Sequence, residues 1–151
     1  MQKSTEYLDN KLKNSSLKDY DNLIKDLPSA KELTFPEFLN KYLSEHNLNL
    51  SDIVKASQIP KDYVYQLVDG RRKPTKDRVI ALCVSAGMSL QEINRALKIC
   101  NVGVLYSKDA RDTAIILCIS ENKSVDEIND FLYEKGHPIL ETSKEAKSLN
   151  K

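Results

Sequence analysis

Five basic side chains lie close together near the middle of the sequence and have the chemistry to bind phosphate. They are Arg71, Arg72, Lys73, Lys76 and Arg78. Residues 55–78 contain seven Lys and Arg against three Asp, a local charge of +4, whereas the whole chain carries only +1. Contacts of this kind position a protein on a nucleic acid without reading its sequence, and they weaken steeply as salt is added. Thr75 is a candidate N-cap, and the first backbone amides of the helix that it opens add a candidate anion site.

A polar helix face precedes this basic cluster. If Val64, Leu67 and Val68 point inward, the outward positions follow steps of three and four and are Lys61, Asp62, Tyr65, Gln66 and Asp69. A glutamine can bond adenine N6 and N7, a lysine can reach guanine O6 or N7, and an aspartate can accept from cytosine N4. A tyrosine ring can lie against a thymine methyl. The alternative is an ordinary solvated face, which the two aspartates favour because carboxylates repel phosphates.

The composition indicates that helices must position these residues. Four Gly and no Trp among 151 residues disfavour a sandwich or barrel, which needs many tight turns. Leu, Ile, Lys and Glu are abundant instead and favour helices. No apolar run approaches the roughly 18 residues of a membrane span, and residues 1–16 lack the apolar core of a signal peptide. We therefore expect an all-helical protein with no membrane partner.

Helix stripes and stop signals divide the chain into segments. In residues 1–33, the spacing of Leu17, Tyr20, Leu23, Ile24 and Leu27 predicts one amphipathic helix, with Ser16 and Asp19 at its start and Pro28 at its end. Residues 34–103 predict five helices, of which the third runs from Pro60 to Gly70, the fourth starts at Thr75 and the fifth starts with the capping box Ser89–Glu92. Residues 141–151 predict a flexible tail.

The two helices that follow repeat the fourth and fifth at an offset of 35 residues. Between residues 82 and 105, nine of 24 aligned positions are identical. The matching residues are Leu82, Cys83, Ser85, Ser89, Glu92, Ile93, Asn94, Leu97 and Leu105, paired with Leu117, Cys118, Ser120, Ser124, Glu127, Ile128, Asn129, Leu132 and Leu140. Gly87 becomes Asn122, which also tolerates the left-handed conformation. We predict a C-terminal helical hairpin at residues 104–140 that extends one core; chance similarity between amphipathic helices is the alternative.

The segment LNLSDIVKASQIPKDYVYQLVDGRRKPTKDRVIALCVSAGMSLQEINRAL resembles the lambda-repressor/Cro-like (XRE) helix-turn-helix family. The resemblance covers about residues 35–98 and depends on Leu48, Ile53, Val64 and Leu67, on Gly70 and Pro74 around the basic loop, and on residues 81–93. It implies five helices, the third in the major groove of DNA, and it assigns base reading to Lys61, Asp62 and Gln66. The family's Gln falls on Leu50, its small Ala on Val54 and its turn Gly on Gln58, where a left-handed backbone costs roughly 1 kcal/mol. Whether that turn takes another geometry is left open.

The sequence thus predicts a transcription regulator that binds double-stranded DNA as a homodimer, and the resemblance implies a bacterial or phage source and a cytoplasmic location. Lys61, Asp62, Tyr65 and Gln66 are the expected base-reading residues, and Arg71, Arg72, Lys73, Thr75, Lys76 and Arg78 the expected phosphate-binding residues. Residues 109–136 carry three basic and seven acidic side chains, a local charge of −4 that repels DNA. The alternative function is therefore a degenerate helix-turn-helix that binds a protein, as a signalling adaptor or an antitoxin-like partner, through this acidic hairpin or the N-terminal helix.

Catalysis, metal binding and cofactors are not expected. The sequence has no phosphate loop, no nucleophile beside a base and no paired Cys or His at metal-ligand spacing. Cys83, Cys100 and Cys118 each lie among apolar residues, which predicts buried, reduced thiols.

Overall fold

Helices and the loops between them make up the part of the chain that the structure describes, residues 16–25 and 33–142. In this computed structural model, the predicted all-helical fold class is confirmed over those residues. The chain divides into two compact units, Met1–Glu32 and Leu33–Lys151. None of the described helices has the length and apolar character needed to cross a bilayer.

The first unit contains a 3-10 helix, η1 (Leu17–Asp19), that continues into α2 (Tyr20–Lys25). A capping box opens it, in which the backbone N–H of Ser16 donates to Asp19 Oδ2 over 3.0 Å. The predicted helix start is therefore present. Leu27 and Pro28, which the sequence predicts at the end of this helix, lie outside the described residues, as does most of the predicted tail.

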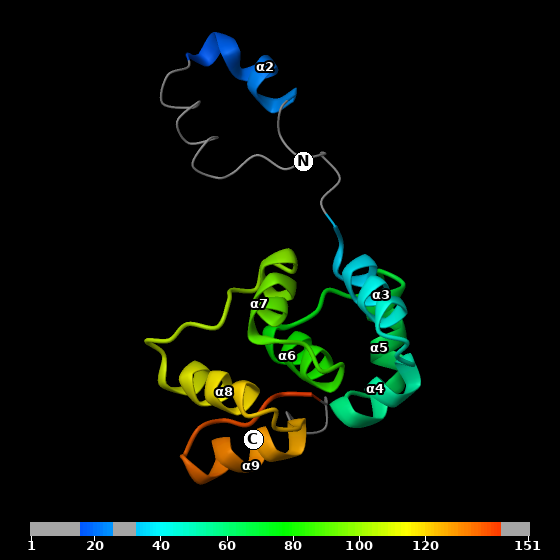
Figure 1. The fold of residues 1–151 in the computed structure, drawn as a ribbon, viewed down its shortest axis with the longest axis vertical. Helices are drawn as coiled ribbons and strands as arrows, with labels where there is room; N and C mark the ends of the chain where they lie inside the picture. The colour runs from blue at the N-terminus through cyan, green and yellow to red at the C-terminus, as the bar shows by residue number, and fades with distance from the viewer. Residues whose placement is uncertain (1–15, 26–32, 143–151) are drawn as a thin grey trace. The chain divides into compact units, whose positions relative to one another are not determined.

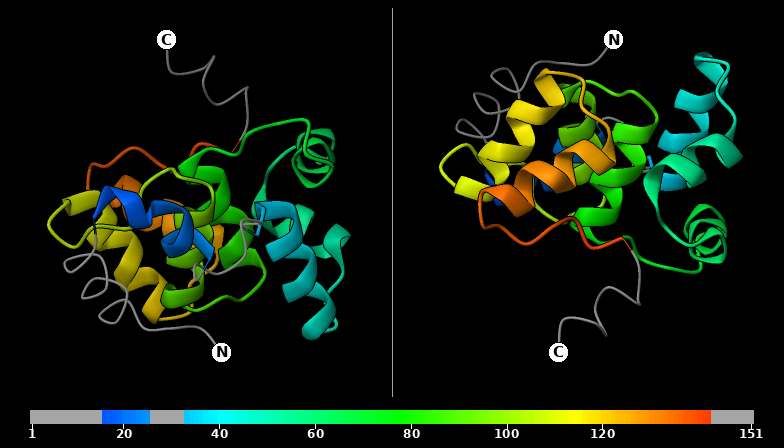
Figure 2. Two further views of the ribbon diagram at one scale, coloured as in Figure 1. Left: turned by 90° about the horizontal axis from the view of Figure 1, so that it is seen from above. Right: turned by 90° about the horizontal axis from the view of Figure 1, so that it is seen from below.

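The second unit contains seven helices among the residues described. They are α3 (Phe35–Glu45), α4 (Leu50–Ser57), α5 (Lys61–Val68), α6 (Lys76–Ser85), α7 (Leu90–Ile99), α8 (Ala110–Ser120) and α9 (Val125–Glu134). We call α6–α7 the first hairpin and α8–α9 the second hairpin. The first hairpin lies between α3–α5 on one side and the second hairpin on the other (Figures 1 and 2). Helix α4 packs against α6, and α3 packs against α7.

Local signals place the helix boundaries close to where the sequence predicts them. Thr75 caps α6 by accepting a hydrogen bond from the backbone N–H of Arg78 at 3.3 Å, and the two Ser-x-x-Glu capping boxes are formed at the starts of α7 and α9. The turns inside the two hairpins contain left-handed residues, Gly87 with φ +80° and Asn122 with φ +59°. Helix α5 begins one residue later than expected, because Pro60 is its N-cap.

Apolar side chains of α3–α9 form one continuous core. The largest side chains that are less than 2% exposed come from both hairpins and from α3 and α5, and include Leu39, Leu67, Ile80, Leu82, Ile93, Leu97, Ile115, Ile128 and Leu132. Burial of each such side chain contributes roughly 1.5–3 kcal/mol. The second hairpin therefore shares a core with the rest of this unit.

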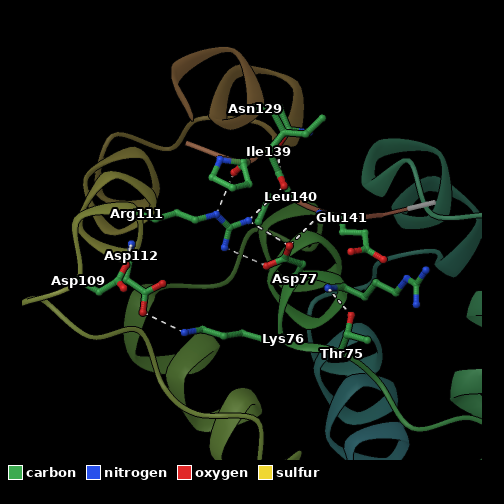
Figure 3. Close-up of polar contacts among 12 residues, drawn as sticks. Thr75, Lys76, Asp77, Asp109, Arg111, Asp112, Asn129, Ile139, Leu140 and Glu141 are labelled. Carbon is green, nitrogen blue, oxygen red and sulfur yellow. Dashed lines mark hydrogen bonds and ion pairs between the residues drawn. The ribbon is translucent and has the colours of Figure 1, made fainter. Parts of the chain in front are cut away.

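Two reciprocal ion pairs join the hairpins (Figure 3). Lys76 Nζ of the first hairpin lies 2.9 Å from Asp112 Oδ2 of the second. Arg111 Nη2 of the second hairpin lies 3.0 Å from Asp77 Oδ2 of the first, and Arg111 Nη1 also reaches Asp77 Oδ1 at 3.2 Å. Residues 76 and 111, and residues 77 and 112, are related by the same offset of 35 as the sequence repeat. Each hairpin therefore contributes one basic and one acidic side chain to the contact, at equivalent positions.

The segment after each hairpin is held by the same asparagine. Asn94 Oδ1 accepts from the backbone N–H of Leu105 at 2.9 Å. Asn129 Oδ1 accepts from the backbone N–H of Leu140 at 2.8 Å. Both leucines are buried, so each asparagine satisfies an amide at a place where the chain turns back onto its own hairpin.

The next residue of each segment crosses to the other hairpin. The N–H of Tyr106 donates to Asp112 Oδ2 at 2.9 Å. The N–H of Glu141 donates to Asp77 Oδ2 at 2.9 Å, as Figure 3 shows. The ion pair, the asparagine contact and this backbone contact of one hairpin thus each have a counterpart with the two hairpins exchanged. This is the contact pattern of an approximate two-fold axis between the hairpins.

Candidate nucleic-acid interface

Helix α5 presents the four expected base-reading residues on its accessible side. Tyr63, Val64 and Leu67 bury the opposite side in the core. Lys61, Asp62 and Tyr65 are exposed and Gln66 is half-buried. Lys61 Nζ lies 5.7 Å from the centre of the Tyr65 ring, so the cation rests near that aromatic face. Val68, expected inward, is only half-buried.

The turn before α5 takes the left-handed conformation without a glycine. Gln58, the C-cap of α4, has φ +65° and ψ +11°. The Gln58 side chain donates a hydrogen bond to Asp126 at the start of α9, which ties this turn to the second hairpin. The Ser57 hydroxyl accepts from the backbone N–H of Ile59 at 3.2 Å and donates to the Val54 carbonyl at 2.8 Å. The alternative geometry that the sequence left open is not adopted.

The basic loop after α5 folds back onto that helix. Gly70 is left-handed, with φ +84°, and the backbone N–H groups of Arg71 and Arg72 both donate to the Gln66 carbonyl, at 2.9 and 3.2 Å. The Arg72 guanidinium donates to Gln66 Oε1. Because the loop and the helix meet in this way, a phosphate-binding candidate and a base-reading candidate lie side by side.

Arg71 is paired with an acidic neighbour. Arg71 Nη2 lies 2.6 Å from Asp69 Oδ2, and the side chains are exposed. The hydrogen bond from Arg71 holds the pKa of the Asp69 carboxyl below its usual value. In water such an exposed pair is weak, so a phosphate can compete for Arg71.

Two of the expected phosphate contacts have other roles. Arg78 is only 8% exposed, and its guanidinium lies 4.0 Å from the centre of the buried Tyr63 ring. Lys76 is drawn toward Asp112 by the ion pair between the hairpins. Their assignment as phosphate ligands stays a prediction. Both have limited access to solvent because α6 is covered on both sides, by α4 and by the second hairpin. Lys73 and Thr75 remain exposed.

Tyr63 contacts Arg72, Arg78 and the backbone of the basic loop. This role was not predicted from the sequence. The Arg72 guanidinium lies 5.1 Å from its ring centre, and its hydroxyl donates to the Lys73 carbonyl at 3.4 Å. It therefore contacts α6 and the basic loop from within α5. The signal that could have revealed it is its position four residues before Leu67, on the buried side of the helix.

An open cleft of about 640 Å³ runs beside α5. Its lining includes cations and amides from α4, α5, the loop and α6: Lys55, Gln58, Gln66, Arg72 and Arg78, with Asp62 at the side. Arg78 Nε is the buried side-chain polar atom without a hydrogen-bond partner in the described part of the chain. A buried donor without an acceptor is costly, and the group that the Arg78 guanidinium contacts here is the face of the Tyr63 ring.

The three thiols are unoxidised, and none is fully exposed. Cys83 and Cys118 are buried, and Cys100 is half-buried. Burial raises the pKa of all three, that of Cys100 to about 11. They are therefore neutral near pH 7, as expected for structural cysteines. Among the residues described, no three His, Cys, Asp or Glu side chains converge as metal ligands would.

Comparisons with family models, with curated proteins and with solved structures gave no match to this chain. The functional interpretation of α4, α5 and the basic loop therefore depends on their own geometry and chemistry.

Proposed function

We propose that the protein is a sequence-specific DNA-binding regulator of transcription. In this proposal α4 and α5 form a helix-turn-helix of the lambda-repressor/Cro-like kind within α3–α7, and α5 enters the major groove. The observation that carries the proposal is the shared accessible side of Lys61, Asp62, Tyr65 and Gln66 directly beside the basic loop 71–73. The charge and the hydrogen-bonding groups on this side suit phosphates and base edges respectively.

Gln66 is the best-placed residue for reading a base. Arg72 fixes its amide orientation by donating to Oε1. The second lone pair of Oε1 is free to accept from adenine N6, while Nε2 donates to adenine N7. Arg72 can at the same time approach the adjacent phosphate, so one contact links affinity to specificity.

A homodimer in the cytoplasm, as the sequence predicts, would place two copies of α5 on half-sites about one helical turn of DNA apart. The mass of the full chain by sedimentation at micromolar concentration tests this prediction. A single-chain mass with and without operator DNA would contradict it.

Selection of duplexes from a random pool at moderate salt tests DNA binding. The wild type should recover a shared motif. The Arg71→Glu/Arg72→Glu variant should recover none, because it replaces two phosphate ligands by charges that phosphates repel. Gln66→Ala should retain its affinity for the DNA backbone but lose its preference at one base pair. The lost discrimination should be about 1–3 kcal/mol.

A charge-matched control separates this site from general electrostatics. Lys98→Glu/Lys108→Glu makes the same change in net charge at exposed positions around the α7–α8 connection, away from α5 (Figure 1). This control should still recover the motif. If neither the wild type nor the control enriches any sequence, sequence-specific DNA binding is refuted. A protein-interaction module would then be the better assignment, supported by the acidic second hairpin.

A further inference from the structure

The second hairpin carries a groove on the side of its helices that no described helix covers. The groove has a volume of about 340 Å³, and its apolar floor is formed by Leu117, Cys118 and Phe131. Leu117 is 53% exposed although α8 packs into the core, so it adds a large apolar side chain to this surface. Charged side chains surround this floor: Glu121, Glu127, Asp130, Glu134 and Lys123.

The same positions of the first hairpin are buried. At the offset of 35, Leu117 corresponds to Leu82, Cys118 to Cys83 and Phe131 to Ala96, and all three first-hairpin residues are 0% exposed. The cover is provided by α4, which packs on α6, and by α3, which packs on α7. No described helix outside the two hairpins packs comparably on α8 or α9. The groove therefore corresponds to the surface of the first hairpin on which α3 and α4 dock.

We propose that this groove binds an amphipathic helix of a partner protein whose apolar stripe is flanked by Lys or Arg. An apolar stripe fits the floor, as in other complexes of a helix in a groove. Four carboxylates against one lysine on the rim set the sign of the flanking charge. The inference is independent of whether α5 binds DNA.

The sequence differences between the hairpins match this assignment. Three apolar positions of the first hairpin become charged in the second hairpin: Ala86 becomes Glu121, Met88 becomes Lys123 and Ile99 becomes Glu134. A surface that is covered permanently can be apolar throughout, whereas one that meets water before its partner arrives needs charges at its edge. Arg95 also becomes Asp130, which makes the rim more acidic.

A second copy of this chain is a poor occupant. If two copies placed their grooves face to face, the four carboxylates of one groove would lie against the four of the other. Like charges across an interface oppose association. A basic helix relieves the repulsion among the same carboxylates.

The experiment is a selection of displayed helices against the full chain. Each helix in the library has apolar residues at i, i+3 or i+4, and i+7, with Lys, Gln or Glu encoded equally at the flanking positions. The recovered helices should carry Lys in preference to Glu by at least about tenfold, which corresponds to 1.4 kcal/mol. The Leu117→Lys variant should weaken their binding at least tenfold, and Glu121→Lys/Glu134→Lys should reverse the preference to Glu.

Tyr133→Lys is the matched control, since Tyr133 is 82% exposed on α9 and does not line the groove. It should bind the recovered helices as the wild type does, and circular dichroism melting should show all variants folded. The proposal is overturned if no helix is enriched, if flanking charge has no effect, or if Leu117→Lys binds normally. It is also overturned if the wild type dimerises and Leu117→Lys abolishes the dimer, because a second copy would then occupy the groove.

Discussion

The two hairpins share their internal contacts and differ in what covers them. Each has a capping box, a left-handed turn residue, an asparagine that holds the following segment and a pair of charges given to the other hairpin. The first hairpin is buried under α3 and α4, whereas the second presents the equivalent side with an acidic rim. The comparison shows that the same helical hairpin can be covered by other helices or can expose one side to solvent. Which of the two occurs depends on a few side chains that take no part in the contacts shared by both hairpins.

Truncation of the paired leucines should give the largest difference between the hairpins. Leu82→Ala removes a side chain that is 0% exposed and should cost about 2–5 kcal/mol of unfolding free energy. Leu117→Ala at the equivalent position should cost less than about 1 kcal/mol, because that side chain is already half in water. Urea denaturation of the full chain measures both. Equal losses would mean that the second hairpin is covered in solution.

The reciprocal ion pairs should contribute unequally despite their shared geometry. Asp112 is 7% exposed in the Lys76 pair, whereas Asp77 is 19% exposed in the Arg111 pair. We expect Asp112→Ala to cost about 3 kcal/mol, since it leaves a partly buried ammonium and the Tyr106 amide without an acceptor, and Asp77→Ala somewhat less. Double-mutant cycles with Lys76→Ala and Arg111→Ala should give couplings of about 1–3 kcal/mol. Coupling free energies near zero would show that the ion pairs do not stabilise the contact between the hairpins.

The paired asparagines should give the smallest effects, equal in the two hairpins. Asn94→Ala and Asn129→Ala each remove one acceptor from a backbone amide, which should cost about 1 kcal/mol. Hydrogen exchange should speed up at the amide of Leu105 in the first variant and at that of Leu140 in the second. Faster exchange at only one of these amides would show that the two-fold relation is incomplete.

Local signals were readable from the sequence, because each involves residues within one turn of helix. The capping boxes at Ser89 and Ser124, the N-cap at Thr75 and the left-handed Gly87 and Asn122 all belong to this class. The all-helical class followed from the same signals and from the apolar spacing. The exposed side of α5 was predicted for the same reason, since the helical period fixes which positions share a side.

Contacts between distant segments were not readable. The placement of Arg78 against Tyr63 requires α5 and α6 to pack at a particular distance, and the position of Lys76 depends on a carboxylate 36 residues away. One further signal was present in the sequence. Asp77 and Asp112 are identical residues at the offset of the repeat, but they lie outside the 24 aligned positions. Including them would have extended the repeat to the residues that join the hairpins.

The amide of Glu141 donates to Asp77, which places a late residue of the chain at the first turn of α6 (Figure 3). This has a consequence for synthesis on the ribosome. When the first hairpin leaves the exit tunnel, Asp77 has neither Arg111 nor Glu141, and Lys76 has no Asp112. The first hairpin therefore acquires its full set of polar partners only after residue 141 has emerged, so in a chain arrested earlier these charges would be solvated by water alone.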